Sequence, residues 1–584
     1  MTPIRAVGTE HETESAVAPL NPTAIAPERE ERLFLLLSIF IGIISGLLVV
    51  SFRMAIDWLQ VLLLGSAPNP HQPRLLIVPA VIGLVVAVLT RYVFPKVRGS
   101  GVNQTKAALY INNGYISFRT VVGKFILSSL AIGGGHSLGP EDPSLQIGAG
   151  VASLISRRIG MSRERLRLFA PVGAAAGLAA AFNAPISAIL FVIEEVIGQW
   201  NAAVLGSIVL GAVSSVVVAR SFWGSEPMFR IPTVTYSSRE LLAYTALGIF
   251  GGIASLLFAK ALGYLRPRLR SQPAWAQMLQ PAMAGLLVGG IGYFGLPQVM
   301  GAGYGAIDQA MHAQFAWKML LLLALFKIIA TTLSFSSGTP GGMFAPTLFI
   351  GAMLGASIGS FEKLYFPQLH LTGSLGSYAL VGMGVLFAAF LRAPLTSVFM
   401  VLEVSGNYSI IVPVILANTI AYVISRSFQP VPVFEMLTHQ DGLYLPSMEE
   451  QREEIELHIE DAMQPVIAPV LQGSETIANA TQSLAQYSGL GEDSTVLVQC
   501  ADGLWYAAKY DELKSLFAQP DGPDRLEARL SKERTPLLFP DQLLASTLPY
   551  FKRWPLLPIT NRAMRGALEG AVSMSDVLKR YQGR

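Results

Sequence analysis

Acidic side chains inside apolar stretches are the first residues of this sequence that could do chemistry. Glu141 lies in the segment Gly-Pro-Glu-Asp-Pro, where a helix should begin, and Glu195 ends a long apolar run. A carboxylate at a helix start is stabilised by free N–H groups and by the positive end of the helix dipole, which would equally stabilise a free anion. Glu141 could therefore gate an anion site, vacating it on protonation or by swinging outward, or it could simply cap the helix.

An anion site also needs donors, and two glycine-rich segments offer them. Ser100 supplies a hydroxyl between two glycines. Residues 336–346 supply backbone N–H groups in a glycine-rich stretch, followed by a helix start at about Met343–Phe344. Neutral donors suit a transported anion, because a Lys or Arg would hold it too tightly for turnover. Each segment alone could instead be an ordinary tight turn, so the hypothesis depends on their matched placement.

That placement comes from an internal repeat. Three segments of the first half recur in the same order in the second half: 97–101 at 299–303, 139–149 at 342–352, and 179–195 at 388–404. Three ordered matches indicate a duplicated unit, with one copy over about 35–230 and the other over about 240–430. Repeats with glycine-interrupted helices are typical of transporters, whose substrate site lies where the repeats meet.

The repeat also separates architectural residues from functional candidates. Glu194 is matched by Glu403, which favours a structural, hydrogen-bonding role for both. Three polar candidates have no such match: Ser100, Glu141 and Glu195 correspond to Ala302, Phe344 and Val404. An acid at membrane depth costs about 2.5–3.5 kcal/mol even on mild insertion scales, so an unmatched acid is a functional candidate by default.

The elements that must position these residues are membrane helices. The chain has 584 residues, of which 52% are hydrophobic and 14% charged, with a net charge of +3 and one cysteine. Residues 33–426 carry 25 basic and 11 acidic groups, whereas the two flanks carry 17 and 28 in only 190 residues. This partition predicts a polytopic membrane unit with soluble ends. A nucleic-acid-binding protein, a collagen and a disulfide scaffold are excluded, because the net charge of +3 is small and Cys500 has no partner within the chain.

The motifs resemble those of the CLC family of chloride channels and transporters. GSGV at 99–102, GPEDP at 139–143, GGMFAP at 341–346 and FNAPISAILFVIEE at 182–195 resemble family segments in order. The resemblance implies an all-α polytopic membrane fold over 32–437, built from two inverted repeats with about 18 intramembrane helices. It also implies a homodimer with one pore per subunit in the lipid bilayer of the cell membrane, or of the inner membrane in a bacterium, with both chain ends cytoplasmic.

The resemblance further implies roles for the candidate residues. Chloride would be held by the hydroxyl of Ser100 and by the amides of Met343 and Phe344. Glu141 would be the external gating glutamate, and Glu195 the internal glutamate that relays protons from the cytoplasm. These roles favour a proton-coupled chloride antiporter. A passive chloride channel is the first alternative, and a membrane-anchored nucleotide sensor, which the unmatched polar residues disfavour, is the second.

Four positions depart from the family pattern. Asn103 stands in place of a proline, Pro140 in place of Arg or Lys, Asp142 in place of glycine, and Phe434 in place of a tyrosine. Asp142 could act on Glu141 by like-charge repulsion, face water, or cap the helix. Phe434 lacks the hydroxyl that would contact chloride and makes the inner gate apolar. The effect of these departures on transport stays open.

The two ends of the chain differ in character. Residues 1–31 are polar and acidic and lack the features of a secretory signal, so we expect a disordered cytoplasmic tail. Residues 438–584 predict a soluble α/β domain in which 502–517 and 565–581 both read as turn, strand and helix. This domain resembles a tandem CBS regulatory module.

In such modules an Asp at a helix start can hold a ribose, so Asp576 is a candidate for binding an adenine nucleotide. A purely structural dimerisation module is the alternative, because the domain has no glycine-rich phosphate loop. No other cofactor and no metal site is expected. No nucleophile, base and orienting group occur together, so the sequence predicts a protein that is not an enzyme.

Overall fold

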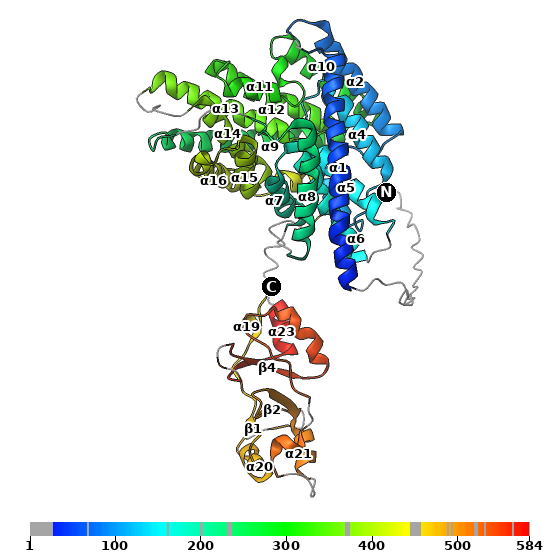
Figure 1. Ribbon diagram of the computed structural model, residues 1–584. Helices are drawn as coiled ribbons and strands as arrows, with labels where there is room; N and C mark the ends of the chain where they lie inside the picture. Colours follow the sequence, from blue (N-terminus) through cyan, green and yellow to red (C-terminus); the bar gives the residue numbers. More distant parts are fainter. Residues whose placement is uncertain are drawn as a thin grey trace, which may run out of the picture. The chain divides into compact units, whose positions relative to one another are not determined.

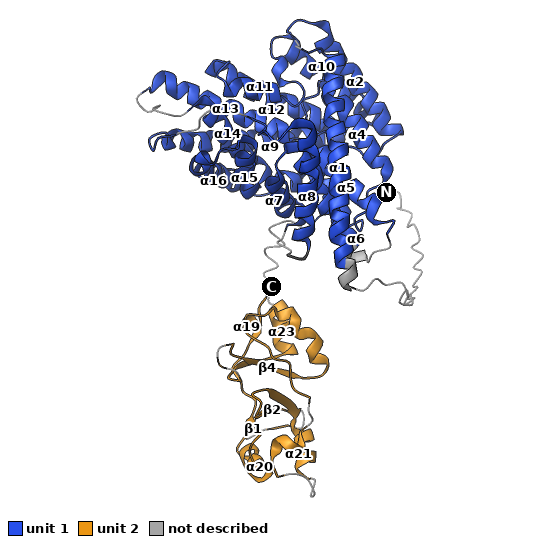
Figure 2. Ribbon diagram, viewed as in Figure 1, with its two compact units in different colours: residues 1–448 blue, residues 449–584 orange. Residues whose placement is uncertain are grey.

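Two units make up the chain, residues 1–448 and residues 449–584 (Figure 2). The structure, a computed structural model, describes residues 27–66, 69–159, 163–198, 202–229, 236–367, 374–443, 445, 457–487, 490–491, 494–518, 524–530, 533–562, 564 and 566–582. Residues 1–26 of the predicted tail lie outside the described residues, whereas residues 27–31 begin the first helix, α1 (Pro27–Leu63). The predicted domain boundary at 437 falls within the last helix of the first unit, α17 (Val433–Gln440).

Seventeen α-helices build the described part of the first unit (Figure 1). Those of the first repeat are α1, α2 (Pro73–Tyr92), α3 (Val102–Tyr110), α4 (Phe118–Gly133), α5 (Glu141–Ser156), α6 (Arg163–Phe182), α7 (Pro185–Phe191) and α8 (Ala202–Trp223). A π-helical stretch, η1 (Val192–Ile197), continues α7. The remaining helices are α9 (Leu241–Arg270), α10 (Ala274–Tyr293), α11 (Tyr304–Met311), α12 (Trp317–Ser336), α13 (Phe344–Tyr365), α14 (Leu375–Leu391), α15 (Pro394–Ser405), α16 (Ile411–Phe428) and α17.

Seven of the described helices are long and apolar enough to cross a membrane. Others are too short to do so, among them α3 with 9 residues and α7 with 7 residues. Backbone ends at membrane depth are tolerated only where protein or a watery cavity surrounds them. Accordingly, α5 is buried along almost its whole length and on all sides. The predicted all-helical membrane fold with interrupted helices is confirmed.

Reciprocal contacts relate the two repeats by a pseudo-two-fold axis. The carboxylate of Glu194 accepts hydrogen bonds from the amides of Leu395 and Thr396 at the start of α15, at 3.1 and 2.9 Å. Its repeat partner Glu403 accepts from the amides of Ile186 and Ser187 at the start of α7, at 2.9 and 2.8 Å. Each repeat makes the same contact to the other: the glutamate of one repeat bonds to the helix start of the other, and the matched residues do the same in reverse. Such a reciprocal relation is isologous, as in a two-fold symmetric dimer. Both matched acids therefore cap a helix of the opposite repeat, as their predicted structural role requires.

Small residues bring the buried helices close together in each repeat. A Cβ on Gly148 of α5 would lie 2.1 Å from the carbonyl oxygen of Gly173 in α6. A Cβ on Gly351 of α13 would lie equally close, 2.1 Å, to the carbonyl oxygen of Gly382 in α14. These glycines are needed because the helix backbones touch there. The contacts fix α5 and α13, whose N-termini carry the candidate site.

The second unit is α/β, as predicted. Strand β1 (Val470–Gln472) pairs parallel with β2 (Thr495–Gln499), β2 pairs antiparallel with β3 (Trp505–Lys509), and β4 (Leu556–Thr560) pairs antiparallel with β5 (Leu568–Ser573). Its helices are α19 (Ile459–Ala462), α20 (Ile477–Ala485), α21 (Tyr510–Phe517), α22 (Leu526–Arg529) and α23 (Met574–Gln582), with the 3-10 segment η4 (Leu544–Lys552). Both predicted turn–strand–helix copies are confirmed, as β3 with α21 and β5 with α23. Each copy has its own apolar core, so the unit is a tandem.

Candidate functional site

The N-termini of α5 and α13 meet at the junction of the two repeats. Gly139 and Gly342, which precede these helices, exchange two backbone hydrogen bonds of 2.8 Å each. These glycines are repeat partners, so the junction lies on the pseudo-two-fold axis. Free N–H groups and the positive ends of two helix dipoles therefore converge on one buried place, which suits a negative charge.

Glu141 occupies this place with its side chain. The residue is completely buried, and its Oε2 accepts a hydrogen bond of 3.3 Å from the amide of Ala345 in α13. A Cβ on Gly139 would lie 2.4 Å from the same oxygen, so a glycine is needed to make room for it. Glu141 thus reaches across to the helix of the opposite repeat.

A second carboxylate lies beside the first. Asp142 is also completely buried, and its Oδ2 accepts a hydrogen bond of 2.5 Å from the amide of Met343. The alternative that Asp142 faces water is therefore wrong. The family resemblance assigned the Met343 and Phe344 amides to chloride, but in the structure the carboxylate of Asp142 occupies the Met343 amide.

Ser100 lies in a loop held open by glycines in front of α3. Gly99 and Gly101 adopt φ values of 86° and 124°, a region that favours glycine. A Cβ on Gly101 would lie 2.6 Å from the carbonyl oxygen of Asp142, so the loop packs directly against the start of α5. The buried hydroxyl oxygen of Ser100 accepts from the amide of Val102 at 3.3 Å. Its O–H group stays available to donate to an anion.

Two buried lysines hold this loop and its repeat partner. Lys124 of α4 donates to the carbonyls of Val97 and Gly99, at 3.0 and 2.6 Å. Lys327 of α12 donates in the same way to the carbonyls of Val299 and Gly301, at 2.9 and 2.8 Å. Sequence reasoning missed this pair. The signal was present, because both lysines interrupt otherwise apolar runs at matched positions of the two repeats.

Aromatic rings line the site around the start of α13. The ring of Phe344 contacts that of Phe191 with centroids 4.8 Å apart, that of Phe387 at 5.3 Å and that of Phe434 at 6.2 Å. Phe434 is fully buried, and its carbonyl oxygen accepts a hydrogen bond of 3.0 Å from the side chain of Asn103. The departure at Asn103 thus ties α3 to the start of α17. It fixes the apolar ring of Phe434 next to the site.

Glu195 is placed in η1, away from the two N-termini. Its carboxylate forms a buried salt bridge of 2.7 Å with the Nζ of Lys106 in α3. The π-helical geometry at this position is of a kind that is frequent at functional sites. The lysine partner was not foreseen, because nothing in the sequence spacing links α3 to η1. It belongs to the same short helix that Ser100 precedes.

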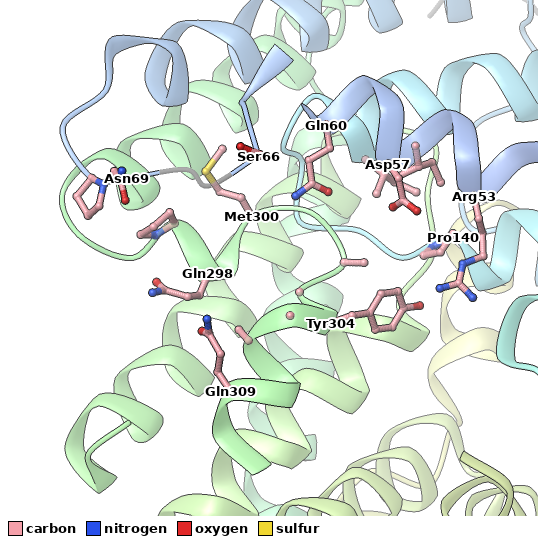
Figure 3. A pocket seen from close by; sticks show the side chains of 18 residues that line it. Arg53, Asp57, Gln60, Ser66, Asn69, Pro140, Gln298, Met300, Tyr304 and Gln309 are labelled. Carbon is pink, nitrogen blue, oxygen red and sulfur yellow. The ribbon is translucent and has the colours of Figure 1, made fainter. Parts of the chain in front are cut away.

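A polar cavity of about 600 Å³ opens beside Pro140, the residue before Glu141 (Figure 3). Arg53 and Asp57 of α1 line it, and Figure 3 shows the guanidinium of Arg53 next to Pro140. The charges of Arg53 and Glu141 are close enough to interact electrostatically. Arg53 therefore places a cation near the position where Pro140 lacks the basic side chain of the family pattern. Sequence reasoning did not identify it.

Asp576 lies in the second unit, at the start of α23. It lines a cavity of about 590 Å³ together with Lys579 and Arg580. Its Oδ2 accepts hydrogen bonds from the amide and the hydroxyl of Ser573, at 3.0 and 2.5 Å. One carboxylate oxygen is thus engaged in capping α23, while two cations stand along the same cavity.

The first unit is similar to known membrane proteins. The family described as "Voltage gated chloride channel" matches residues 82–426. The "H(+)/Cl(-) exchange transporter ClcA" of Salmonella arizonae is 32% identical over 421 residues, covering 69% of this chain and 87% of the relative.

Two solved structures share the fold. The structure of "a slow cyanobacterial Cl-/H+ antiporter" has a TM-score of 0.64 at 24% identity, covering 74% of this chain and 100% of that one. The structure of "a eukaryotic CLC transporter" has a TM-score of 0.60 at 21% identity, covering 94% of this chain and 98% of that one. Because the second match covers 94% of this chain, it includes most of the α/β unit, and the similarity of fold extends into that unit.

Proposed function

We propose that this chain, which belongs to the voltage gated chloride channel (CLC) family, moves chloride across the membrane in exchange for protons. This is a family of transporters and channels and not of enzymes. The observation that carries the proposal is the pair of unmatched, buried glutamates in the membrane unit. Glu141 lies on a helix N-terminus where an anion would bind, and Glu195 lies elsewhere in the same buried region.

Glu141 is proposed as the gate. Its ionised carboxylate accepts from the amide of Ala345, so it competes with chloride for the N-terminus of α13. A proton removes the negative charge and weakens this charge-assisted hydrogen bond. The neutral side chain can then leave, and chloride takes its place against the same helix dipole. Binding of a proton to Glu141 and binding of chloride at the helix N-terminus are thereby coupled.

Chloride itself is proposed to bind between the two repeats. The hydroxyl of Ser100 and the amides of Met343 and Phe344 supply the donors, without a full positive charge at contact distance. The ring of Phe434 closes the inner side of the site, where the family has a tyrosine hydroxyl. Fewer donors should lower the affinity for chloride, but the helix N-terminus remains the principal attraction.

Glu195 is proposed to pass the proton toward the cytoplasm. Its carboxylate is buried and bonded to Lys106 at 2.7 Å. The lysine lets a charged carboxylate exist in the protein interior, where an unpaired one would be costly. A carboxylate that is negatively charged without its proton and neutral with it is suited to relay protons.

A passive chloride channel on the same fold is the alternative, and a flux experiment separates the two. Purified protein is reconstituted in liposomes with a chloride gradient and no proton gradient. As chloride runs down its gradient, an exchanger moves protons in the opposite direction and builds up a proton gradient. Chloride flux without any proton movement would identify a channel and contradict the proposed exchange.

We also propose, from family membership, that two subunits form a homodimer with one pore each and that both chain ends are cytoplasmic. Native mass spectrometry of the detergent-solubilised protein should give the mass of a dimer. Protease added outside sealed right-side-out vesicles should leave the α/β unit intact. A monomeric mass, or cleavage of that unit from outside, would contradict the respective statement.

For the α/β unit we propose an adenine nucleotide at Asp576. A carboxylate can bind ribose hydroxyls, and the two cations in the same cavity, Lys579 and Arg580, suit phosphates. Titration of the full-length chain with ATP should show binding that Asp576→Asn weakens and that Asp511→Asn, in the other copy, leaves unchanged. Absence of binding by the unchanged protein would favour the structural dimerisation module instead.

A further inference from the structure

Asp142 is a buried acid that the proposed exchange does not use. Its Oδ2 accepts from the amide of Met343 at 2.5 Å, while its Oδ1 has no hydrogen-bond partner among the described residues. A half-satisfied carboxylate in a buried place is costly to maintain. A functional role for Asp142 would explain why this cost is tolerated.

The surroundings are shaped to accept this carboxylate. A Cβ on Gly342 would lie 2.3 Å from Asp142 Oδ2, just as a Cβ on Gly139 would lie 2.4 Å from Glu141 Oε2. The two glycines that exchange hydrogen bonds on the pseudo-two-fold axis therefore each leave room for one carboxylate. Glu141 and Asp142 occupy neighbouring positions along the N-terminus of the same helix, α13.

The contact between Asp142 and Met343 has no counterpart in the other half of the junction. The repeat partner of Asp142 is Ala345, which has no carboxylate, and the repeat partner of Met343 is Pro140, which has no N–H. The start of α5 is therefore built without a carboxylate from the second repeat. Since the architecture forms on that side without such a contact, the contact on the other side is not a requirement of the fold.

We propose that Asp142 is a second tethered anion, which occupies the Met343 amide of the chloride site and must be displaced when chloride binds there. The proposal rests on the proposed chloride transport and deepens it. A backbone N–H donates one strong hydrogen bond, so the Met343 amide cannot serve Asp142 and chloride at once. The measured affinity for chloride is then the intrinsic affinity reduced by the fraction of molecules in which Asp142 has left.

The charged groups around Asp142 allow it to move. Glu141 is the neighbouring like charge and repels it, whereas the ammonium of Lys124 in α4 attracts it from a distance. Lys124 is already bonded to the carbonyls of Val97 and Gly99, so it does not pin the carboxylate in a direct ion pair. Among the described residues, the amide of Met343 at the start of α13 is the one hydrogen-bond donor to the Asp142 carboxylate, and it is a donor proposed for chloride.

The test compares chloride binding by Asp142→Asn and Asp142→Gly in the full-length, purified protein. Asparagine keeps the size and removes the charge, and glycine is the residue of the family pattern. Calorimetric titration with chloride at constant pH should give affinities that are higher than that of the unchanged protein, by at least about tenfold for Asp142→Gly. Asp308→Asn, which removes an exposed acid of α11, is the control and should leave the affinity unchanged.

A merely structural cap predicts a different result. If Asp142 only stabilises the start of α13, both variants should melt at lower temperature and bind chloride no more tightly. Equal or weaker binding by both variants, with chloride flux intact, would overturn the role of Asp142 and leave the exchange proposal standing. Absence of chloride flux in the unchanged protein and in the variants would overturn both.

A measurement on the unchanged protein guards against variants that fail to fold. Infrared difference spectra, recorded with and without chloride, should contain a carboxylate band that reports the displacement of Asp142. The same band should be absent from Asp142→Asn. A chloride-induced spectrum that is identical in the two proteins would also overturn the proposal.

Discussion

At the scale of single residues, the membrane unit holds its buried acids with two different kinds of partner. Glu141 and Asp142 rest on backbone amides at a helix N-terminus, whereas Glu195 is paired with the full charge of Lys106. A carboxylate leaves backbone amides more easily than it leaves a cation with which it forms a direct ion pair. The first arrangement suits groups that must give way to an anion, and the second suits a group that stays in place while its proton comes and goes.

Lys106→Met tests the buried ion pair. The variant leaves Glu195 without a partner and should lower the free energy of unfolding by about 3–5 kcal/mol. The double variant Lys106→Met with Glu195→Gln removes both charges and should recover most of that loss. Denaturant titration of the purified protein gives these values. Equal losses in the single and double variants would show that the unpaired Glu195 carboxylate is not the cause of the loss.

Phe434→Tyr tests whether the inner side of the site lacks a donor. The added hydroxyl lies next to the proposed chloride and should tighten binding by about 1 kcal/mol, or about fivefold. Phe361→Tyr, on a half-exposed position of α13, is the matched control and should change nothing. Calorimetric titration with chloride checks both variants. Weaker chloride binding by Phe434→Tyr would place chloride elsewhere.

Some of the site residues could be predicted from the sequence, because the repeat supplies an internal comparison. Glu141 and Glu195 were identified as unmatched acids in apolar segments, and the structure buries both. The Lys106 partner of Glu195 could not be predicted, because it depends on how α3 packs against η1. The contact of Asp142 with Met343 also required the structure, since it crosses from one repeat to the other.

At the scale of elements, the loops before α3 and α11 are held by the same kind of lysine contact but carry different side chains. Lys124 holds the loop that carries Ser100, and Lys327 holds the matched loop, where Ala302 stands. Each ammonium satisfies two buried carbonyls, which would otherwise lack partners. The pair therefore offers a comparison in which stability and anion binding can be separated.

Lys124→Met and Lys327→Met should each lower the free energy of unfolding by about 1–3 kcal/mol, because each leaves two buried carbonyls unpaired. Only Lys124→Met should also weaken chloride binding, since only that loop positions the Ser100 hydroxyl. Denaturant titration and chloride calorimetry on the same preparations check this expectation. A loss of chloride affinity of the same size in both variants would contradict it.

The elements were predictable to different degrees. The breaks before α5 and α13 follow from Gly-Pro and Gly-Gly segments, and the two turn–strand–helix copies of the α/β unit follow from their alternating patterns. The pseudo-two-fold relation of the repeats did not follow from the sequence matches, because matched segments do not give direction. It required the reciprocal contacts of Glu194 and Glu403.

At the scale of the whole molecule, the membrane unit and the α/β unit have separate apolar cores. Cys500, the one cysteine of the chain, lies in the core of the first α/β copy. Burial raises the pKa of its thiol to about 11, chiefly through desolvation. It can therefore report on the integrity of that unit without interference from other thiols.

Alkylation of Cys500 should follow this raised pKa in the native protein. The rate should rise toward about pH 11 in the native protein, whereas in denaturant it should rise around the ordinary thiol pKa of about 8.5. Because the native state holds the thiol proton more tightly, its contribution to stability is complete below about pH 8.5 and is lost as the pH rises through about 11. Cys500→Ala should remove that loss. Identical pH profiles in the native and denatured protein would contradict the burial of the thiol.

The central claim is that two buried glutamates couple chloride to protons, and one measurement tests it most directly. Liposomes containing the unchanged protein, Glu141→Ala or Glu195→Gln are given a chloride gradient, and proton and chloride movements are recorded together. The account predicts uphill proton movement by the unchanged protein only, with chloride flux retained by Glu195→Gln. Uphill proton movement that survives in both variants would contradict it.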